Sequence, residues 1–239
     1  MDVLVAVSKV AKYATSESGD TLEMVERPGG GLSLVLADGQ RSGRSAKALS
    51  NVVARKAISL LGEGVRDGAA ARAASDYLYT YRGGKVLATL NILSIDLQTQ
   101  TMVVTRNNPA PVVIVDNGNL KLLDDESPVV GIRRGIRPLI HEIPLSLGLT
   151  AVVFTDGLLH AGQRAGTPMD AVGSLRALMA EGQPNPEHWV ERLVTQAVEL
   201  DLGRPVDDIS VLVASVVASS GSEVRRLHLQ LPLGFKGPG

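Results

Sequence analysis

Four aspartates in this sequence stand where an apolar run meets a polar loop. Asp38 and Asp156 each end a short apolar run and are followed by glycine, whereas Asp20 and Asp207 each precede such a run. Apolar runs of this length between turn signals predict buried β-strands rather than helices. Because strand ends on one side of a sheet lie close together, we expect the four carboxylates to converge.

Four carboxylates in a small space need cations, because like charges a few ångströms apart repel or force protonation. The sequence has no cysteine and only 4 histidines, so the ligands would be oxygen atoms, which suit Mg²⁺ or Mn²⁺ better than zinc. Two such ions about 3.5–4 Å apart serve displacement at phosphorus by a metal-activated water. Alone, Asp38-Gly39 would be an ordinary turn dipeptide. Beside the other aspartates it favours a binuclear centre, in which Gly39 leaves its carbonyl oxygen open to an ion.

The elements that would position these residues are short strands and two pairs of helices. The patterns predict strands over 3–7, 22–27, 32–38, 87–97, 101–106, 111–115, 120–123, 139–145, 149–155, 209–217 and 224–231. They predict helices over 45–61, 67–81, 168–180 and 185–202. A Gly-rich turn after Pro28 makes a hairpin of the second and third strands, so Asp20 should lie near Asp38. The second half of the chain is typical of an antiparallel meander, and the fold class is α+β.

Composition restricts the class of protein. The 239 residues, 44% of them hydrophobic, support a substantial core, and neither a linker nor a domain-sized repeat is visible. We expect one domain over 1–233 and a flexible tail over 234–239. The net charge of −1 and the 3% of aromatic residues argue against nucleic acid binding, and no run reaches transmembrane length. We therefore expect a cytoplasmic protein that binds neither nucleic acid nor membranes, and its oligomeric state stays open.

Six short motifs, in this order along the chain, resemble those of the metal-dependent PPM serine/threonine phosphatases, most closely the bacterial SpoIIE-type branch. Four contain the aspartates: Ser18-Gly19-Asp20-Thr21, Ala37-Asp38-Gly39-Gln-Arg-Ser-Gly43, Phe154-Thr155-Asp156-Gly157 and Asp207-Asp208-Ile209-Ser210. Two lie between the second and third of these: Ala88-Thr89-Leu90 and Arg106-Asn107-Asn108-Pro109-Ala110. Each motif is short, but the ordered set covers most of the chain and is specific.

The resemblance implies a four-layer αββα sandwich, in which two antiparallel sheets flanked by helices hold two divalent cations, Mn²⁺ or Mg²⁺, at one end. It implies that Asp38 bridges the two cations and that Gly39 contributes its carbonyl oxygen. Asp156 and Asp207 would complete the shell of one cation, and Asp20 would bind directly or through water. Asp38 and Asp20 are thus the candidate catalytic residues.

Two neighbours of these ligands need an interpretation. The family pattern favours Asp207 over Asp208 as the ligand, with Asp208 holding water or capping the strand. His160 follows Asp156 closely along the chain. We interpret it as a helix or loop histidine near the site without a ligand role.

The cation that binds substrate phosphate is not assigned. Eukaryotic-type relatives use an arginine near the N-terminus, where this chain has only Lys9 and Lys12. Arg41 and Arg44 follow Asp38 and are candidates by position, but we interpret them as solvated loop charges.

The resemblance also implies a function. This branch hydrolyses phosphoserine or phosphothreonine on a partner protein, typically a bacterial regulatory protein such as an anti-sigma-factor antagonist in stress or sporulation signalling. The chain begins almost at the first motif, so we expect a bare catalytic domain without the N-terminal sensor of many relatives. The alternative is a catalytically inactive PPM-like docking module in the same pathway. All four aspartates are retained, which argues against it, because a decayed site has no reason to keep clustered carboxylates.

Overall fold

A computed structural model describes residues 1–230 and 232. Its strands are β1 (Asp2–Val10), β2 (Asp20–Glu26), β3 (Gly31–Gly39), β4 (Ala88–Asp96), β5 (Thr101–Asn107), β6 (Val112–Asp116), β7 (Asn119–Leu123), β8 (Leu139–Pro144), β9 (Thr150–Phe154) and β10 (Ile209–Val217). Its α-helices are α1 (Gly43–Gly62), α2 (Asp67–Arg82), α3 (Asp156–His160), α4 (Ala171–Ala180) and α5 (Pro186–Leu200), and a 3₁₀ turn spans Gln163–Ala165.

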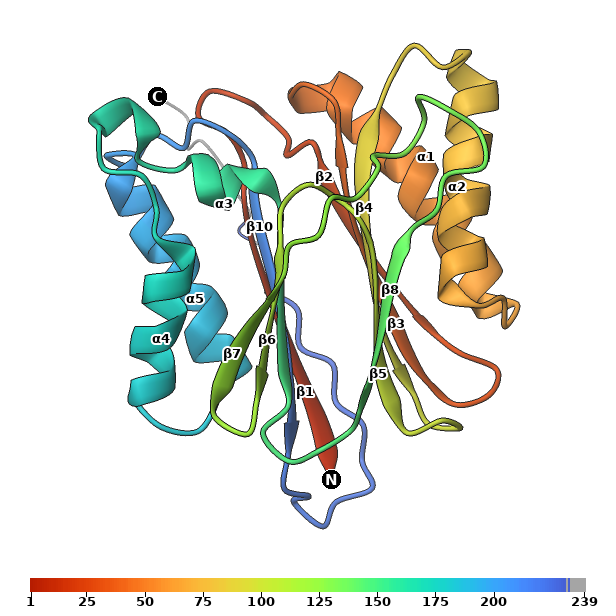
Figure 1. The fold of residues 1–239 in the computed structure, drawn as a ribbon. Helices are drawn as coiled ribbons and strands as arrows, with labels where there is room; N and C mark the ends of the chain where they lie inside the picture. Colours follow the sequence, from red (N-terminus) through yellow and green to blue (C-terminus); the bar gives the residue numbers. More distant parts are fainter. Residues whose placement is uncertain (231, 233–239) are drawn as a thin grey trace.

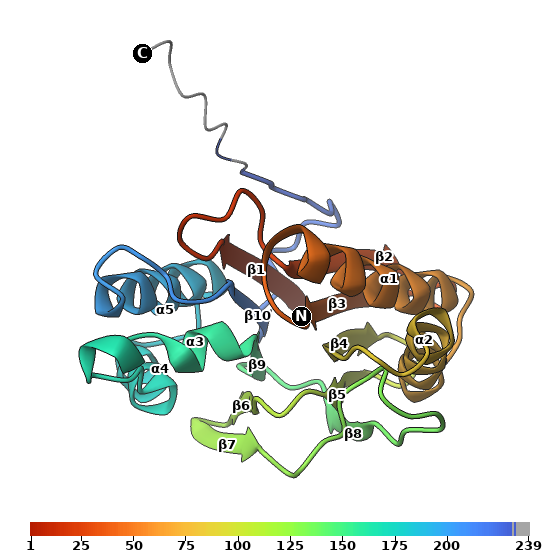
Figure 2. The ribbon, with the colours of Figure 1, turned by 90° about the horizontal axis from the view of Figure 1, so that it is seen from above.

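The strands form two five-stranded antiparallel sheets that lie face to face. One sheet has the order β1-β10-β9-β6-β7 and the other the order β2-β3-β4-β5-β8. Helices α1 and α2 cover the outer face of the second sheet, and α4 and α5 cover the outer face of the first, as Figures 1 and 2 show. The predicted αββα sandwich is confirmed.

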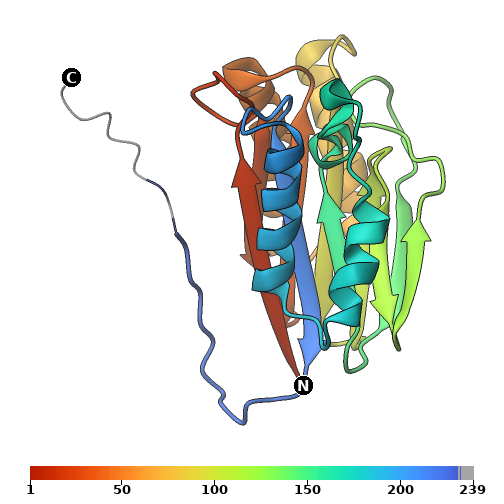
Figure 3. The ribbon, with the colours of Figure 1, turned by 90° about the vertical axis from the view of Figure 1, so that its left-hand side faces the viewer.

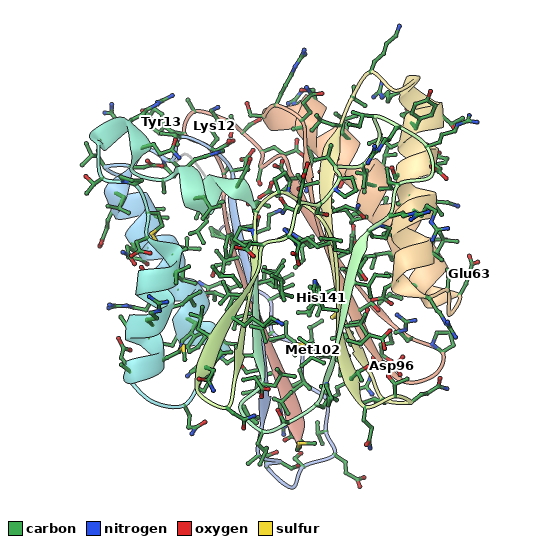
Figure 4. The ribbon with its side chains drawn as sticks, in the orientation of Figure 1. Lys12, Tyr13, Glu63, Asp96, Met102 and His141 are labelled. Atoms are coloured by element: carbon green, nitrogen blue, oxygen red, sulfur yellow. The ribbon has the colours of Figure 1, made fainter. Side chains whose placement is uncertain are left out.

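Three apolar clusters hold the four layers together. One lies between the sheets and includes Leu36, Met102 and Leu212, while the other two lie between each sheet and its own helices. Met102 and His141 are labelled in the inter-sheet layer in Figure 4. Each buried large apolar side chain stabilises the fold by about 1.5–3 kcal/mol. The sheets therefore form a rigid frame for the groups at their ends.

The helices that cover the sheets are amphipathic. Among residues 1–230 and 232, no helix combines the length and the apolar character that crossing a membrane requires.

The hairpin of β2 and β3 sets the register on which the candidate site depends. Asp20 lies directly opposite Asp38 across the two strands, as predicted. The turn needs glycine at Gly31, whose φ is +97° and whose hypothetical Cβ would lie 1.9 Å from the Ile95 carbonyl oxygen. The Gly-rich turn thus fixes which residue of β3 faces Asp20.

The second half of the chain departs from a single meander. Strands β4, β5 and β8 belong to one sheet, whereas β6, β7 and β9 belong to the other. The chain crosses between the sheets after β5, after β7 and after β8. Short apolar runs cannot predict this crossing, because both sheets bury strands of the same composition.

The predicted strand over 224–231 is wrong for its described part. Residues 218–230 form no strand and leave the sandwich after β10, as Figure 3 shows. This segment contacts the edge strands β1 and β2 through their side chains, by hydrogen bonds from Ser219 and Ser220 to Asp2 and an ion pair of Arg225 with Glu26. Leu227 and Leu229 stay exposed despite their alternating pattern. Residue 231 and the predicted flexible tail over 234–239 lie outside the described residues.

A buried ion pair fastens the β2–β3 hairpin to α2. Arg27 and Asp67 are only 10% and 6% exposed, and the Ser94 hydroxyl also donates to Asp67. Asp67→Asn leaves the guanidinium without a carboxylate, and removal of one partner of a buried pair costs about 3–5 kcal/mol. We expect the free energy of unfolding in urea to fall by about 3 kcal/mol.

The matched control for this variant is Glu26→Gln, which removes the exposed ion pair with Arg225. Exposed pairs of this kind contribute little, so its urea midpoint should stay at the wild-type value. Equal losses in the two variants would contradict the role given to Asp67.

Candidate metal centre

Asp20 is the most buried of the four candidate aspartates and is held from the opposite sheet. Its carboxylate Oδ2 accepts hydrogen bonds from Ser210 Oγ at 2.5 Å and from Thr155 Oγ1 at 3.0 Å. Both donors come from the ends of β9 and β10, so these bonds join the two sheets at this end. The other oxygen, Oδ1, is buried and has no protein partner. A buried carboxylate oxygen without a partner is costly, and a cation would satisfy it.

Asp38 lies opposite Asp20 and is half-buried. Burial raises its pKa to about 9, and the charges of Asp20 and Asp156, followed by that of Asp207, act in the same direction. Burial also raises the pKa of Asp20 to about 6 and the pKa of Asp207. The fold therefore brings together the four aspartates predicted to converge. Their carboxylates repel one another, and this repulsion adds to burial in raising the pKa of Asp38 and of Asp207.

Asp156 and Asp207 form the open side of this cluster. Asp156 is the first residue of α3, a single helical turn that the sequence patterns did not predict, and Asp207 lies two residues before the start of β10. Their side chains are 45% and 35% exposed. His160, at the end of α3, places Nδ1 4.0 Å from Asp156 Oδ2 and 3.9 Å from Asp207 Oδ2. One ligand atom from each of the three residues lies within 4.8 Å of the others.

Asp208 binds backbone groups of a loop and does not face the cluster as Asp207 does. Its two carboxylate oxygens accept hydrogen bonds from the backbone N–H groups of Lys12 and Gly19, both at 2.9 Å, and its side chain is buried. Figure 4 shows Lys12 on the loop between β1 and β2, at the site end of the sandwich. Asp208 thus anchors this loop and leaves Asp207 to face the cluster, which supports the predicted order of the two aspartates.

Two glycines beside the aspartates permit close backbone packing. A Cβ at Gly39 would lie 2.0 Å from the Ala46 carbonyl oxygen at the start of α1, and one at Gly157 would lie 2.0 Å from the Asp208 carbonyl oxygen. No side chain fits either gap. The glycines therefore let α1 and the start of β10 approach the aspartates, whereas the predicted metal contact of the Gly39 carbonyl stays a prediction.

Two lysines bring positive charge behind the cluster. Lys9 Nζ and Lys47 Nζ both donate to the backbone carbonyl oxygen of Asp20, at 2.8 and 2.6 Å. Burial, followed by the neighbouring Lys47 charge, lowers the pKa of Lys9. The sequence patterns did not single out Lys47, because it is one of several cations on the polar face of a helix. Arg41 and Arg44 are exposed, as expected for solvated loop charges.

A cation fits this arrangement on the evidence of the protein atoms. The donors are carboxylate oxygens, one of them buried without a partner, and burial together with the neighbouring carboxylates raises the pKa of Asp38. Hard oxygen donors are those that Mg²⁺ and Mn²⁺ accept. A four-layer αββα sandwich with aspartates from both sheets at one end defines the class of PPM metal-dependent phosphatases.

The chain belongs to the SpoIIE family within that class. The family model for Stage II sporulation protein E (SpoIIE) matches residues 28–217. A comparison with curated proteins found no match. The expectation of a metal-dependent protein phosphatase is therefore confirmed at the level of the family.

Solved structures show the same fold at low sequence identity. The PP2C phosphatase domain of SpoIIE from Bacillus subtilis, solved with a fragment of its regulatory domain, aligns with a TM-score of 0.78 at 18% identity, over 90% of this chain and 64% of that chain. RsbX in complex with magnesium aligns at 0.67 and 17% identity, over 89% and 94% of the two chains. The catalytic domain of PstP with two manganese ions aligns at 0.67 and 17%, over 90% and 99%. The ions of the last two are those predicted for this class.

The raised pKa of Asp38 has a consequence for stability. Its carboxyl group prefers the proton in the folded protein, so its contribution to stability is complete below its ordinary pKa and is lost as the pH rises toward 9. Without metal, the melting temperature of the wild type should fall between pH 6 and 9, measured by circular dichroism. Asp38→Asn imitates the protonated form and should melt several degrees higher at pH 8.

The control for this pH series is Asp124→Asn, a change at an exposed position outside the cluster, which should keep the wild-type slope. If the melting temperature of metal-free Asp38→Asn equalled that of the wild type at every pH, the carboxyl group of Asp38 would not prefer its protonated form.

The two neighbouring aspartates can be separated by experiment. Asp207→Asn should weaken Mn²⁺ binding by tenfold or more in calorimetric titrations, because a carboxylate ligand is lost, and should leave the metal-free melting temperature unchanged or higher. Asp208→Asn places an amide donor against a backbone N–H group, so it should lower the melting temperature and largely keep Mn²⁺ affinity. The reverse pattern would show that Asp208 is the ligand.

Proposed function

We propose that this protein hydrolyses phosphoserine or phosphothreonine on a partner protein at a binuclear Mn²⁺ or Mg²⁺ centre. The observation that carries the proposal is the convergence of Asp20, Asp38, Asp156 and Asp207 at one end of the sandwich. The family of the chain supports the reaction class, and the arrangement of carboxylates supports the location of the centre.

The proposed ligands follow the places of the aspartates in the fold. Asp38 lies opposite Asp20 across the hairpin and is close enough to Asp156 and Asp207 for their charges to raise its pKa, which suits a ligand shared by two cations. Asp20 would contribute its unpartnered Oδ1, and Gly39 its carbonyl oxygen. When bound, such cations supply positive charge for the phosphate oxygens and make a water acidic enough to attack phosphorus.

The protein's own groups orient this set. The hydroxyls of Thr155 and Ser210 hold Asp20 in one rotamer, so Oδ1 keeps its direction. Lys9 and Lys47 fix the backbone of Asp20 through its carbonyl oxygen. These contacts act by position, because a ligand that is already held in place needs no reorganisation as charge develops in the reaction. The four fixed contacts on Asp20 are this kind of support.

The openness of the site supports a protein substrate. Asp156 and Asp207 are partly exposed, so a phosphorylated side chain on a folded partner or a peptide could reach them. Together with the family, this supports a bacterial regulatory phosphoprotein, such as an anti-sigma-factor antagonist. The proposal also includes a single phosphatase domain over residues 1–233 and a cytoplasmic location.

A catalytically inactive docking module remains the alternative, and the site argues against it. Asp20 is fully buried and carries an oxygen without a partner. Keeping such a group lowers stability unless it serves a ligand. A module that only docks a partner would be more stable with an uncharged residue in place of Asp20.

The decisive experiment compares phosphatase activity in the wild type and Asp38→Asn. We expect hydrolysis of p-nitrophenyl phosphate and of a phosphoserine peptide that depends on added Mn²⁺ and stops on chelation. Asp38→Asn should lose at least a thousandfold in kcat/KM, because the ligand shared by both cations is gone.

The control is Asp124→Asn, outside the cluster, which should keep wild-type activity. Activity that survives chelation would contradict the metal mechanism. Mn²⁺ binding without hydrolysis of any phosphoester would favour the docking module, and hydrolysis of the small ester alone would point to a small-molecule phosphatase.

A further inference from the structure

The imidazole of His160 lies near two proposed metal ligands, Asp156 and Asp207. Its Nδ1 lies 4.0 Å from Asp156 Oδ2 and 3.9 Å from Asp207 Oδ2. Asp156 belongs to the same single turn, α3, whereas Asp207 comes from the chain that enters β10. The imidazole therefore faces carboxylates of two separate elements, and the sequence spacing alone shows only the first of these contacts.

The distances do not fit hydrogen bonds. A nitrogen that donates to a carboxylate oxygen lies about 2.7–3.2 Å from it, so His160 is hydrogen-bonded to neither aspartate. Nitrogen and oxygen ligands each lie about 2.0–2.2 Å from a common divalent ion, which separates them by about 3–4 Å. The distances of 3.9 and 4.0 Å lie at the upper end of this range, so a small side-chain rotation would place the three groups around one cation.

The surrounding groups favour a cation over a simple ion pair. Asp20 Oδ1 is buried and unpartnered in the same cluster, and the carboxylate charges there act together on Asp38. A pair of His160 with Asp156 alone, four residues apart on one turn, would be exposed and would contribute little. It would also leave the approach to Asp207 unexplained.

We propose that His160 Nδ1 is a ligand of the cation held by Asp156 and Asp207. This inference rests on the proposed function and adds a nitrogen atom to an otherwise all-oxygen set. Imidazole suits the later first-row transition ions, whereas Mg²⁺ prefers oxygen and keeps its water. His160 therefore biases this centre toward transition ions over Mg²⁺.

The test compares His160→Ala with the wild type by calorimetric titration of the metal-free proteins with Co²⁺ and Mg²⁺. Loss of the imidazole should raise the Kd for Co²⁺ by about tenfold or more and change the Kd for Mg²⁺ less than about threefold. Pulsed electron paramagnetic resonance of the Mn²⁺-loaded wild type should show coupling to ¹⁴N that disappears in the variant.

The matched control is His188→Ala, since His188 is a similarly exposed histidine that pairs with Glu181 away from the cluster. It should keep both Kd values and the ¹⁴N coupling. Metal-free melting curves check that His160→Ala is folded, and the spectrum of the wild type tests the proposal without any variant.

The outcomes separate this inference from the proposed function. Absence of ¹⁴N coupling in the wild type, or equal changes in the Co²⁺ and Mg²⁺ Kd values, would overturn the role of His160. If the wild type still hydrolysed the phosphoserine peptide with Mn²⁺ in that case, and Asp38→Asn did not, the proposed function would stand. A wild type that binds neither ion would overturn both.

Discussion

Repulsion among four carboxylates at the junction of two sheets is the constraint on which this structure depends. Asp20 and Asp38 face each other across β2 and β3, and burial raises the pKa of both. Isolated carboxylates in such a place would push the strands apart or take up protons. The fold holds them because apolar clusters on both sides of each sheet fix the strands. The stability of the sandwich thus supports a local arrangement that is unfavourable until cations arrive.

The two sheets contribute to the centre in different ways. The β2–β3 hairpin supplies Asp20 and Asp38, whereas the other sheet supplies the hydroxyls of Thr155 and Ser210 that hold Asp20. Asp156 and Asp207 enter from the same ends of β9 and β10. A shift of one sheet relative to the other would therefore change the spacing of ligands across the whole centre. At this end of the sandwich the hydrogen bonds of Thr155 and Ser210 to Asp20 add to the apolar packing between the sheets, and they limit such a shift.

The sequence predicted those parts of the fold and site that depend on local patterns. Strand ends marked by Asp-Gly and the Gly-rich turn were sufficient to predict that Asp20 and Asp38 face each other. The contacts of Lys47 with Asp20 and of His160 with Asp207 were not predictable, because they join segments whose distance is set by tertiary packing. The strand expected after β10 does not form, because alternation shows that a segment can pair and not that its backbone will join a sheet edge.

The neighbouring aspartates before β10 show how tightly the site depends on alignment. Asp208 points to the loop between β1 and β2, while Asp207 points to the cluster. Asp207 lies in a bend and Asp208 directly precedes the strand, so a slip of one residue in β10 would carry Asp208 into the place of Asp207. The anchor of the loop would then stand among the proposed metal ligands. The pairing of Val10 with Ile209 fixes the register of β10. This register therefore determines which aspartate faces the cluster, as well as the shape of the sheet.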